Sequence, residues 1–311
     1  MDEMKKGTID LIIPTYKPDK TFAELLNRIK VQTVSVRHIY IINTEESLLD
    51  EERFDLEDNV TVIHITKEMF DHGGTRNYGA SLSNAEFVMF MTQDAMPANR
   101  YLIENILRGF EQEEVAAVYG RQLPRKDAKV IECYTREFNY PDKDQLKSKR
   151  DLETLGIKTY FCSNVCAAYR KSVYEMMNGF VTKTIFNEDM IMAANMIEAG
   201  YSIFYASKAV VRHSHEYTYR EQFSRNFDLA VSQKEYHDIF GKVKSENEGM
   251  RLVKDTMKYL ANNKKAYLIP DLIIQSGFKY LGYKAGKNYD KLPMSVIRKL
   301  SMNPSYWKVE V

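Results

Sequence analysis

The chain has 311 residues and a nearly balanced charge, with 44 lysines and arginines against 43 aspartates and glutamates. This length is enough for one large domain with an appended region of roughly 100 residues. No apolar run reaches the length of about 20 residues that a membrane-spanning helix needs. The charged first residues do not resemble a signal peptide, so we expect a cytoplasmic protein.

The overall balance hides a basic C-terminal region. Residues 241–311 hold 14 of the 44 basic residues but only 6 of the 43 acidic ones, which gives them a net charge of +8 and leaves −7 on residues 1–240. Such a tail predicts a polyanionic partner, of which the three main kinds are a membrane surface, a nucleic acid and a phosphorylated substrate. No recognised nucleic-acid-binding motif accompanies the charge, so we expect no nucleic acid partner.

Apolar runs and turn residues divide the first part of the chain into alternating strands and helices. The expected strands cover residues 9–13, 38–43, 60–65, 87–93, 115–119, 159–169, 201–205 and 209–211. The expected helices cover residues 20–32, 78–83, 99–110 and 191–199. The polar residues 121–158 indicate a long loop with at most short helices. This order predicts an α/β fold with a mostly parallel central sheet and flanking helices.

We expect residues 1–218 to form this α/β domain and residues 219–311 to form a basic, mainly helical region. Helical periods run over residues 220–236, 252–260, 268–283 and 294–300. The segment from Lys279 to Lys287 mixes aromatic residues with lysines, as a helix at a membrane interface does. Membrane association, acceptor binding and homo-oligomerisation are open roles for this region, and packing against the first domain is the plainer alternative.

One apolar run, residues 87–93, ends in a carboxylate, Asp94, and then a proline, Pro97. The run is short and apolar enough to be a strand buried on both faces. Asp94 would then lie at the carboxyl end of that strand, where open α/β sheets bind ligands. The same edge of the sheet should hold Thr15, Asn43 and Gly73.

A second motif is Phe70-Asp-His-Gly-Gly-Thr-Arg-Asn77. Two adjacent glycines ahead of a helix let the backbone approach a ligand, and the helix N–H groups together with Arg76 offer donors to an anion. The motif therefore predicts a phosphate site. A Gly-x-Gly-x-x-Gly fingerprint after the first strand and a Walker lysine loop are both absent from the sequence, which argues against ordinary dehydrogenases and P-loop enzymes.

The order of these pieces resembles family 2 glycosyltransferases with the Rossmann-like GT-A fold. The pieces are Ile13-Pro-Thr-Tyr16, an Asp-containing tripeptide after the fourth strand, and Glu188-Asp189 at the start of a later helix. The motif at residues 70–77, together with Thr92-Gln-Asp-Ala95 and His213-Ser-His215, more narrowly resembles the bacterial rhamnosyltransferase branch that builds cell-wall polysaccharides. The C-terminal region also resembles that of streptococcal polyrhamnose enzymes. The resemblance spans about residues 7–230.

The resemblance implies a divalent cation, Mg²⁺ or Mn²⁺, that offsets the charge of a sugar diphosphate. Asp94 matches the last acid of the family's Asp-x-Asp motif, and Thr92 stands where the first acid is usual. His215 matches a histidine that many such enzymes recruit to the metal. His213 lies on the same side of an extended segment because side chains repeat with a period of two.

The resemblance also assigns the acid pair and the donor site. Asp189 matches the general base and Glu188 a supporting acid, whereas the plain alternative is a pair of charges that complement a helix dipole. The residues expected to contact the donor are Thr15, Glu45, His72, Gly73, Gly74, Arg76, Asn77, Thr92 and Gln93.

The implied reaction is an inverting transfer of rhamnose from dTDP-β-L-rhamnose to a lipid-diphosphate-linked saccharide in cell-wall polysaccharide synthesis. A peripheral location on the inner face of the plasma membrane, against its anionic surface, would suit such an acceptor. Two alternatives stay open. The donor could be UDP-galactofuranose or a UDP-hexose, or the chain could be a non-catalytic nucleotide-sugar-binding scaffold.

Overall fold

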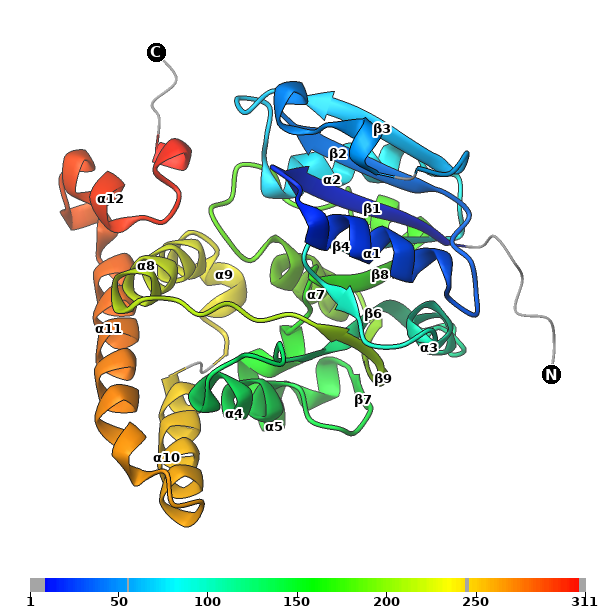
Figure 1. Cartoon of the computed structure of the whole chain (residues 1–311). Coiled ribbons are helices and arrows are strands. Elements are labelled where there is room, and N and C mark those ends of the chain that lie inside the picture. Colours follow the sequence, from blue (N-terminus) through cyan, green and yellow to red (C-terminus); the bar gives the residue numbers. More distant parts are fainter. Residues whose placement is uncertain (1–8, 55, 244–245, 308–311) are drawn as a thin grey trace. The chain divides into compact units, whose positions relative to one another are not determined.

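The computed structural model describes residues 9–54, 56–243 and 246–307 and has a mixed α/β architecture (Figure 1). The chain forms two compact units. The first takes in the chain up to residue 125, with residues 140–182 and 188–213, and the second takes in residues 126–139, 183–187 and 214–311. The assignment of separate roles to residues 1–218 and 219–311 stays a prediction.

The first unit is built on one nine-stranded sheet with the order β3-β2-β1-β4-β8-β6-β9-β5, and β7 also pairs with β9. The strands are β1 (Ile9–Tyr16), β2 (Ile39–Thr44), β3 (Val60–Ile65), β4 (Phe87–Met91), β5 (Met96–Pro97), β6 (Val115–Leu123), β7 (Gln145–Lys147), β8 (Cys166–Arg170) and β9 (Ser202–Arg212). The helices of this unit are α1 (Lys20–Lys30), α2 (His72–Ser81), α3 (Leu102–Arg108), α5 (Leu152–Leu155), α6 (Lys171–Met176) and α7 (Glu188–Glu198).

The sheet is mixed, and only part of it is parallel. The pairs β1–β2, β2–β3, β1–β4 and β6–β9 are parallel, as expected. By contrast, β8 runs antiparallel to both β4 and β6, with Met91 opposite Cys166. The start of β8 therefore lies at the same edge as the ends of β1, β2 and β4, so the loop before β8 can supply residues to that edge.

The core of this sheet follows from the sequence pattern. All five residues of β4 are buried, because the strand is covered on both faces. The helix α1 buries Phe22, Leu25, Leu26 and Ile29, which recur every three or four residues and so share one face. Its first turn is capped by Asp19, whose side chain accepts a hydrogen bond from the Thr21 N–H at 2.8 Å.

Residues 121–158 are not the long loop that their polar composition predicts. They contain the end of β6, the ten-residue helix α4 (Val130–Asn139), which belongs to the second unit, and β7. In β7 the side chain of Lys147 is buried, its ammonium donates to the carbonyls of Lys158 and Phe161, and it lies 4.6 Å from the ring centre of Tyr119. Burial lowers the pKa of Lys147 to about 7. Because a charged residue occupies a buried position in β7, the apolar pattern of the sequence does not indicate this strand.

Two other boundaries differ from expectation. The segments expected as strands at residues 201–205 and 209–211 form one strand, β9, because a register shift opposite Gly120 and Arg121 accommodates the residues between them. The expected strand at residues 159–169 begins only at Cys166, after a short 3₁₀ turn at Gly156–Tyr160.

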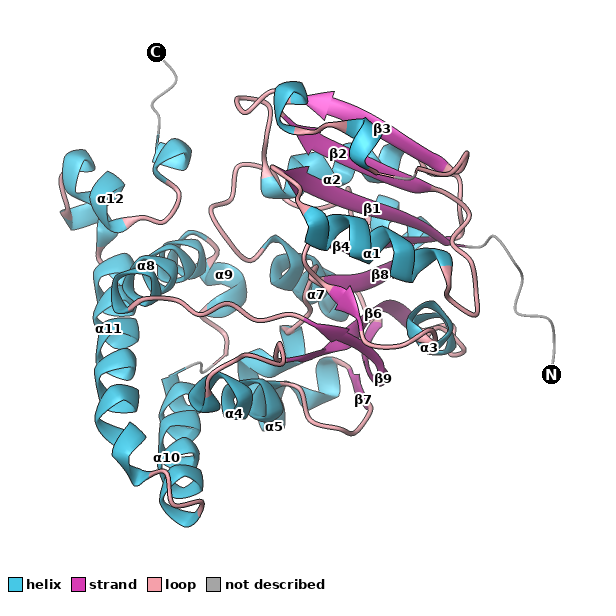
Figure 2. Cartoon of the chain, viewed as in Figure 1, coloured by secondary structure: helices cyan, strands magenta, loops and turns pink. Residues whose placement is uncertain are grey.

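The second unit is helical (Figure 2). Besides α4 it contains α8 (Tyr219–Glu235), α9 (His237–Phe240), α10 (Glu246–Asn262), α11 (Ile269–Lys287) and α12 (Met294–Leu300). The helices α8 and α11 pack closely, because Gly282 and Gly286 let the backbones approach. A Cβ atom at either glycine would lie 2.2 Å from a carbonyl oxygen of α8, that of Phe223 or that of Phe227. None of the helices in the described part of the chain combines the length and the apolar composition that a bilayer-spanning segment needs.

We predict that Gly282→Ala destabilises the protein, because the new methyl group collides with the backbone of α8 and the two helices must separate. The expected loss is about 1–3 kcal/mol of unfolding free energy, as for other overpacked sites. The matched control is Gly277→Ala in the same helix, where a Cβ would meet nothing within 4 Å. That change should stabilise by about 0.5–1 kcal/mol through helix propensity. Chemical denaturation of both variants measures the difference, and equal effects would contradict the packing described here.

Candidate active site

The ends of β1, β2 and β3 carry a chain of hydrogen-bonded polar side chains, of which Thr15 and Asn43 are buried. The Thr15 hydroxyl donates to Asn43 Oδ1 at 3.1 Å, and the Asn43 amide donates to the Glu45 carbonyl at 3.0 Å. The same amide lies 3.0 Å from His64 Nδ1, and His64 Nε2 lies 3.1 Å from a Glu51 oxygen. Because the amide group donates, His64 accepts through Nδ1 and carries its proton on Nε2. His64 was not among the expected site residues. Its polar side chain within the apolar strand β3 is the sequence signal by which it could have been found.

Glu45 lies just beyond β2 with φ of +67°, in the region that ordinarily favours glycine. Its carboxylate accepts a hydrogen bond from the Lys67 N–H at 2.6 Å and so ties the ends of β2 and β3 together. Thr15 and Glu45 are thus both at the expected edge of the sheet. Their contacts with a donor stay predictions.

The motif at residues 70–77 forms the start of α2 rather than a loop ahead of a helix. The helix begins at His72, so Gly73 and Gly74 lie in its first turn, and the Asp71 side chain caps the Gly74 N–H at 2.6 Å. A Cβ on Gly73 would lie 2.0 Å from the Val181 carbonyl oxygen. This glycine is therefore required where α2 meets the segment around Val181. The sequence pattern missed this start because glycines disfavour helix interiors.

Asn77, expected at the donor site, holds the chain after α6. Its Oδ1 accepts from the Phe180 N–H at 2.8 Å and from the Tyr174 hydroxyl, and its amide donates to the Phe180 carbonyl at 2.8 Å. These bonds fix the turn that contains Gly179, whose φ is +69°. A donor contact by Asn77 stays a prediction.

An acid pair begins α7. Asp189 Oδ2 accepts from the Asn164 N–H at 3.1 Å, and its Oδ1 accepts from the Met190 N–H at 2.8 Å. Glu188 is paired with Arg76 of α2, with 3.3 Å between the carboxylate and the guanidinium. Arg76 is itself anchored to α2 by a 2.8 Å hydrogen bond to the His72 carbonyl. The ion pair between Arg76 and Glu188 thus joins α2 and α7, which lie far apart in the sequence.

The two carboxyl groups differ in their protonation. Burial raises the pKa of Asp189 to about 7, with a further contribution from the charge of Glu188. Burial also acts to raise the pKa of Glu188, but the charges of Arg76 and His72, together with hydrogen bonds to the carboxylate, hold that pKa below its ordinary value. One buried acid is therefore kept ionised and the other exchanges its proton near neutral pH, which is the condition for acid–base work.

The acid pair lies at the same sheet edge as Asp94. Asn164, which binds Asp189, precedes β8, and the next residue, Val165, accepts a hydrogen bond from the Thr92 N–H at 3.3 Å. The Thr92 hydroxyl is buried and has no hydrogen-bond partner within the described part of the chain. The neighbouring Gln93 pairs with the main chain of Tyr16, through bonds of 2.8 and 3.0 Å, and so joins the ends of β1 and β4.

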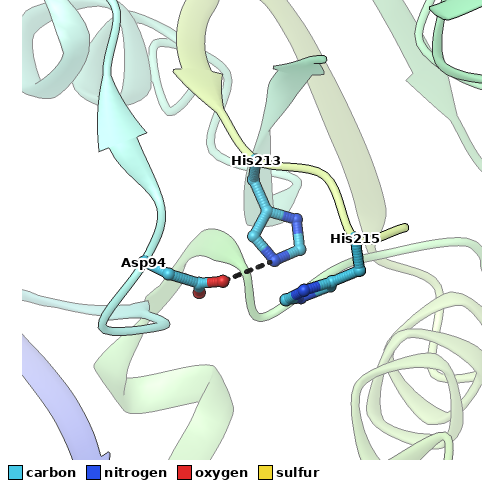
Figure 3. Close-up of side chains that lie close together, drawn as sticks. All are labelled: Asp94, His213 and His215. Carbon is cyan, nitrogen blue, oxygen red and sulfur yellow. Dashed lines mark ion pairs between the residues drawn. The ribbon is translucent and has the colours of Figure 1, made fainter. Parts of the chain in front are cut away.

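Asp94 faces two histidines (Figure 3). One ligand atom from each of Asp94, His213 and His215 lies within 4.8 Å of the other two. Asp94 Oδ2 and His213 Nε2 are 3.5 Å apart. His213 directly follows the strand β9, which is joined to the turn after Asp94 by the pairing of Met96 with Arg212. His215 follows two residues later in the extended segment.

The donor set fits a divalent cation. His213 Nδ1 lies 3.1 Å from Gln122 Oε1, and the Gln122 amide donates to the Ser163 hydroxyl at 3.0 Å, so the glutamine oxygen faces the ring. In the neutral imidazole the proton is then on Nδ1, and the lone pair of Nε2 points toward the Asp94 carboxylate. A divalent cation between these two atoms would accept a lone pair from each, and a partner that orients the ring is typical of histidine ligands.

The family model described as glycosyl transferase family 2 matches residues 10–177 of the chain. The O-antigen chain rhamnosyltransferases RfbN of Salmonella typhimurium and WbaN of Salmonella anatum are each 42% identical to it over 308 residues, covering 96% of the chain and 96% and 95% of their own lengths. Among solved structures, the mannosyltransferase PcManGT from Pyrobaculum calidifontis, in complex with GDP-Man and Mn²⁺, matches 98% of the chain and 86% of its own length, at a TM-score of 0.56 and 15% identity.

These matches bear out the resemblance on which the expected GT-A fold was based. The solved structure shares the fold at low identity, while the family model and the relatives establish the family. A sheet edge that gathers an acid pair and an Asp-His-His cluster is consistent with an enzyme that transfers sugars. The chain belongs to glycosyl transferase family 2.

Proposed function

We propose that this glycosyltransferase moves L-rhamnose from dTDP-β-L-rhamnose to a hydroxyl of a lipid-diphosphate-linked saccharide, with inversion at the anomeric carbon. The observation that carries the mechanism is the half-buried carboxyl of Asp189, which lies beside the ionised Glu188 and whose pKa of about 7 suits a general base near neutral pH. The sugar assignment is supported by the names of the two Salmonella relatives. Their O-antigen names also support a saccharide acceptor and a role in surface polysaccharide synthesis.

In the proposed step, Asp189 accepts the proton of the acceptor hydroxyl as its oxygen bonds to the anomeric carbon. The bond between that carbon and the diphosphate oxygen breaks, and dTDP leaves with the electron pair. A single displacement of this kind converts a β-linked donor into an α-L-rhamnoside. The N–H groups of Asn164 and Met190 orient the Asp189 carboxylate, which supports this role.

Arg76 acts as a positioning residue in this proposal. It pairs with Glu188 and keeps that acid ionised, and the ionised Glu188 in turn raises the proton affinity of Asp189. The pair also links α2, which carries the expected donor-binding motif, to α7, which carries the base. His72, Gly73, Gly74 and Asn77 would then shape the donor site mainly by fixing α2, whereas Thr15, Glu45, Thr92 and Gln93 lie at the strand ends nearer the expected nucleotide.

We propose that a divalent cation is held by Asp94, His213 and His215. Its positive charge would offset the negative charge of the departing diphosphate. Two imidazoles among three ligands favour Mn²⁺ over Mg²⁺, because Mg²⁺ prefers oxygen ligands. The anchored acceptor would bring the protein, as a cytoplasmic enzyme, to the inner face of the plasma membrane.

The reaction is tested by incubating the protein with a synthetic lipid-diphosphate saccharide and one donor at a time: dTDP-β-L-rhamnose, UDP-galactofuranose or UDP-glucose. We expect product only from the rhamnose donor, with an α-linkage by NMR.

Asp189→Asn should lower the rate by about 100- to 10,000-fold while donor binding persists, because only proton transfer is lost. Faster transfer from a UDP-sugar would refute the donor assignment, and full activity in Asp189→Asn would refute the mechanism.

The metal site is tested by calorimetric titration of the protein with Mn²⁺ in the absence of donor. We expect one site whose affinity falls at least about tenfold in Asp94→Ala and about 10- to 100-fold in Gln122→Ala, the residue that orients His213. The control is Asp58→Ala, which removes an exposed carboxylate distant in sequence from the cluster. Unchanged Mn²⁺ affinity in Asp94→Ala would exclude this cluster as the metal site.

A further inference from the structure

The helix α11 has an apolar face that the second unit leaves exposed. Its members, called here the outer face of α11, are Ile273, Ile274, Gly277, Tyr280, Leu281 and Lys284. The exposed fractions of the four large apolar side chains are 54% for Ile273, 45% for Ile274, 58% for Tyr280 and 58% for Leu281. So much exposed apolar surface in one helix marks an interaction site.

These residues share one face because they recur at helical spacing. The opposite face packs on α8 through Gly282 and Gly286, and Leu272 is buried on that side as well. The helix is therefore apolar around most of its circumference, although only one side has a partner within the described residues of the second unit. A helix that is apolar around most of its circumference is typically buried on more than one side.

The charges of α11 restrict what can cover the outer face. The only acid in the helix is Asp271, which lies toward α8 and accepts hydrogen bonds from the Tyr219 hydroxyl and, at 2.8 Å, from the Gln275 amide. The outer face itself carries Lys284, whose ammonium lies 5.4 Å from the ring centre of Tyr280. Lys287 lies at the same distance from the ring of Tyr283. The face thus combines aliphatic, tyrosine and lysine side chains without any carboxylate.

We propose that the outer face of α11 docks on the surface of an anionic lipid bilayer. Aliphatic side chains would enter the boundary between headgroups and acyl chains, tyrosines would lie at headgroup level, and lysines would meet lipid phosphates. A second copy of the chain fits less well, because a symmetric contact would bring two Lys284 residues and two regions of net charge +8 together. The helix would lie in the plane of the interface, since no described helix crosses a bilayer.

The full chain is the sample for the test, and sedimentation with vesicles is the measurement. Vesicles of phosphatidylglycerol and phosphatidylcholine in equal parts are compared with vesicles of phosphatidylcholine alone. We expect the wild-type protein to pellet with the anionic vesicles, and less so as salt is raised. The double variant Ile274→Asp/Leu281→Asp should lose at least about 100-fold in partition coefficient, and Lys284→Glu about tenfold or more.

The matched control is Val31→Asp/Met69→Asp, which makes the same kind of change at two apolar residues of the first unit that are 65% and 67% exposed. It should bind anionic vesicles as the wild type does, and circular dichroism should show all variants folded. The proposal fails if the wild type ignores anionic vesicles, if the outer-face variants bind unchanged, or if the control loses binding equally. It also fails if ultracentrifugation finds a dimer that only the outer-face variants dissociate. Vesicle binding needs neither donor nor acceptor, so it stands or falls separately from the proposed reaction.

Discussion

The ion pair between Arg76 and Glu188 is the interaction on which the candidate site depends. It is buried, so the guanidinium and the carboxylate are each costly to leave without the other. The ionised Glu188 adds to the effect of burial on the neighbouring Asp189, and the folded protein binds the Asp189 proton more tightly than the unfolded chain does. That contribution to stability is complete below the ordinary pKa of 3.8 and is lost as the pH rises toward about 7. Near neutral pH the protein therefore loses this contribution to its stability, and Asp189 becomes able to accept a proton as a base.

The topology of the sheet explains why the parts of the site meet. The ends of β1, β2 and β4 share an edge because these strands are parallel, and β8 adds the loop with Asn164 because it starts at that edge. The pairing of β5 with β9 then brings His213 to Asp94. Most of the candidate side chains thus lie at or beside a strand end or a helix start, and rigid elements of this kind hold a site in a defined geometry.

The sequence was informative where local pattern decides structure. The apolar runs predicted β1 to β4, and Asp94 lies where the run before it ends. Pattern failed where partners lie far apart in the chain: nothing in the residues around Arg76 indicates its pairing with Glu188, and the burial of Lys147 depends on carbonyls supplied by a separate turn. The early start of α2 was missed because tertiary contact with Val181, rather than helix propensity, selects Gly73. The roles of the expected site residues stay predictions.

The pH dependence of kcat/KM for rhamnosyl transfer tests the central claim most directly. If Asp189 is the base, the rate of the wild-type enzyme should rise with pH along a limb whose midpoint is near 7, because the free enzyme must lose that proton first. Glu188→Gln should move the midpoint to lower pH, since the variant removes the charge that raises the proton affinity of Asp189. A wild-type limb near the ordinary aspartate value, or a midpoint that Glu188→Gln leaves unchanged, would contradict the account.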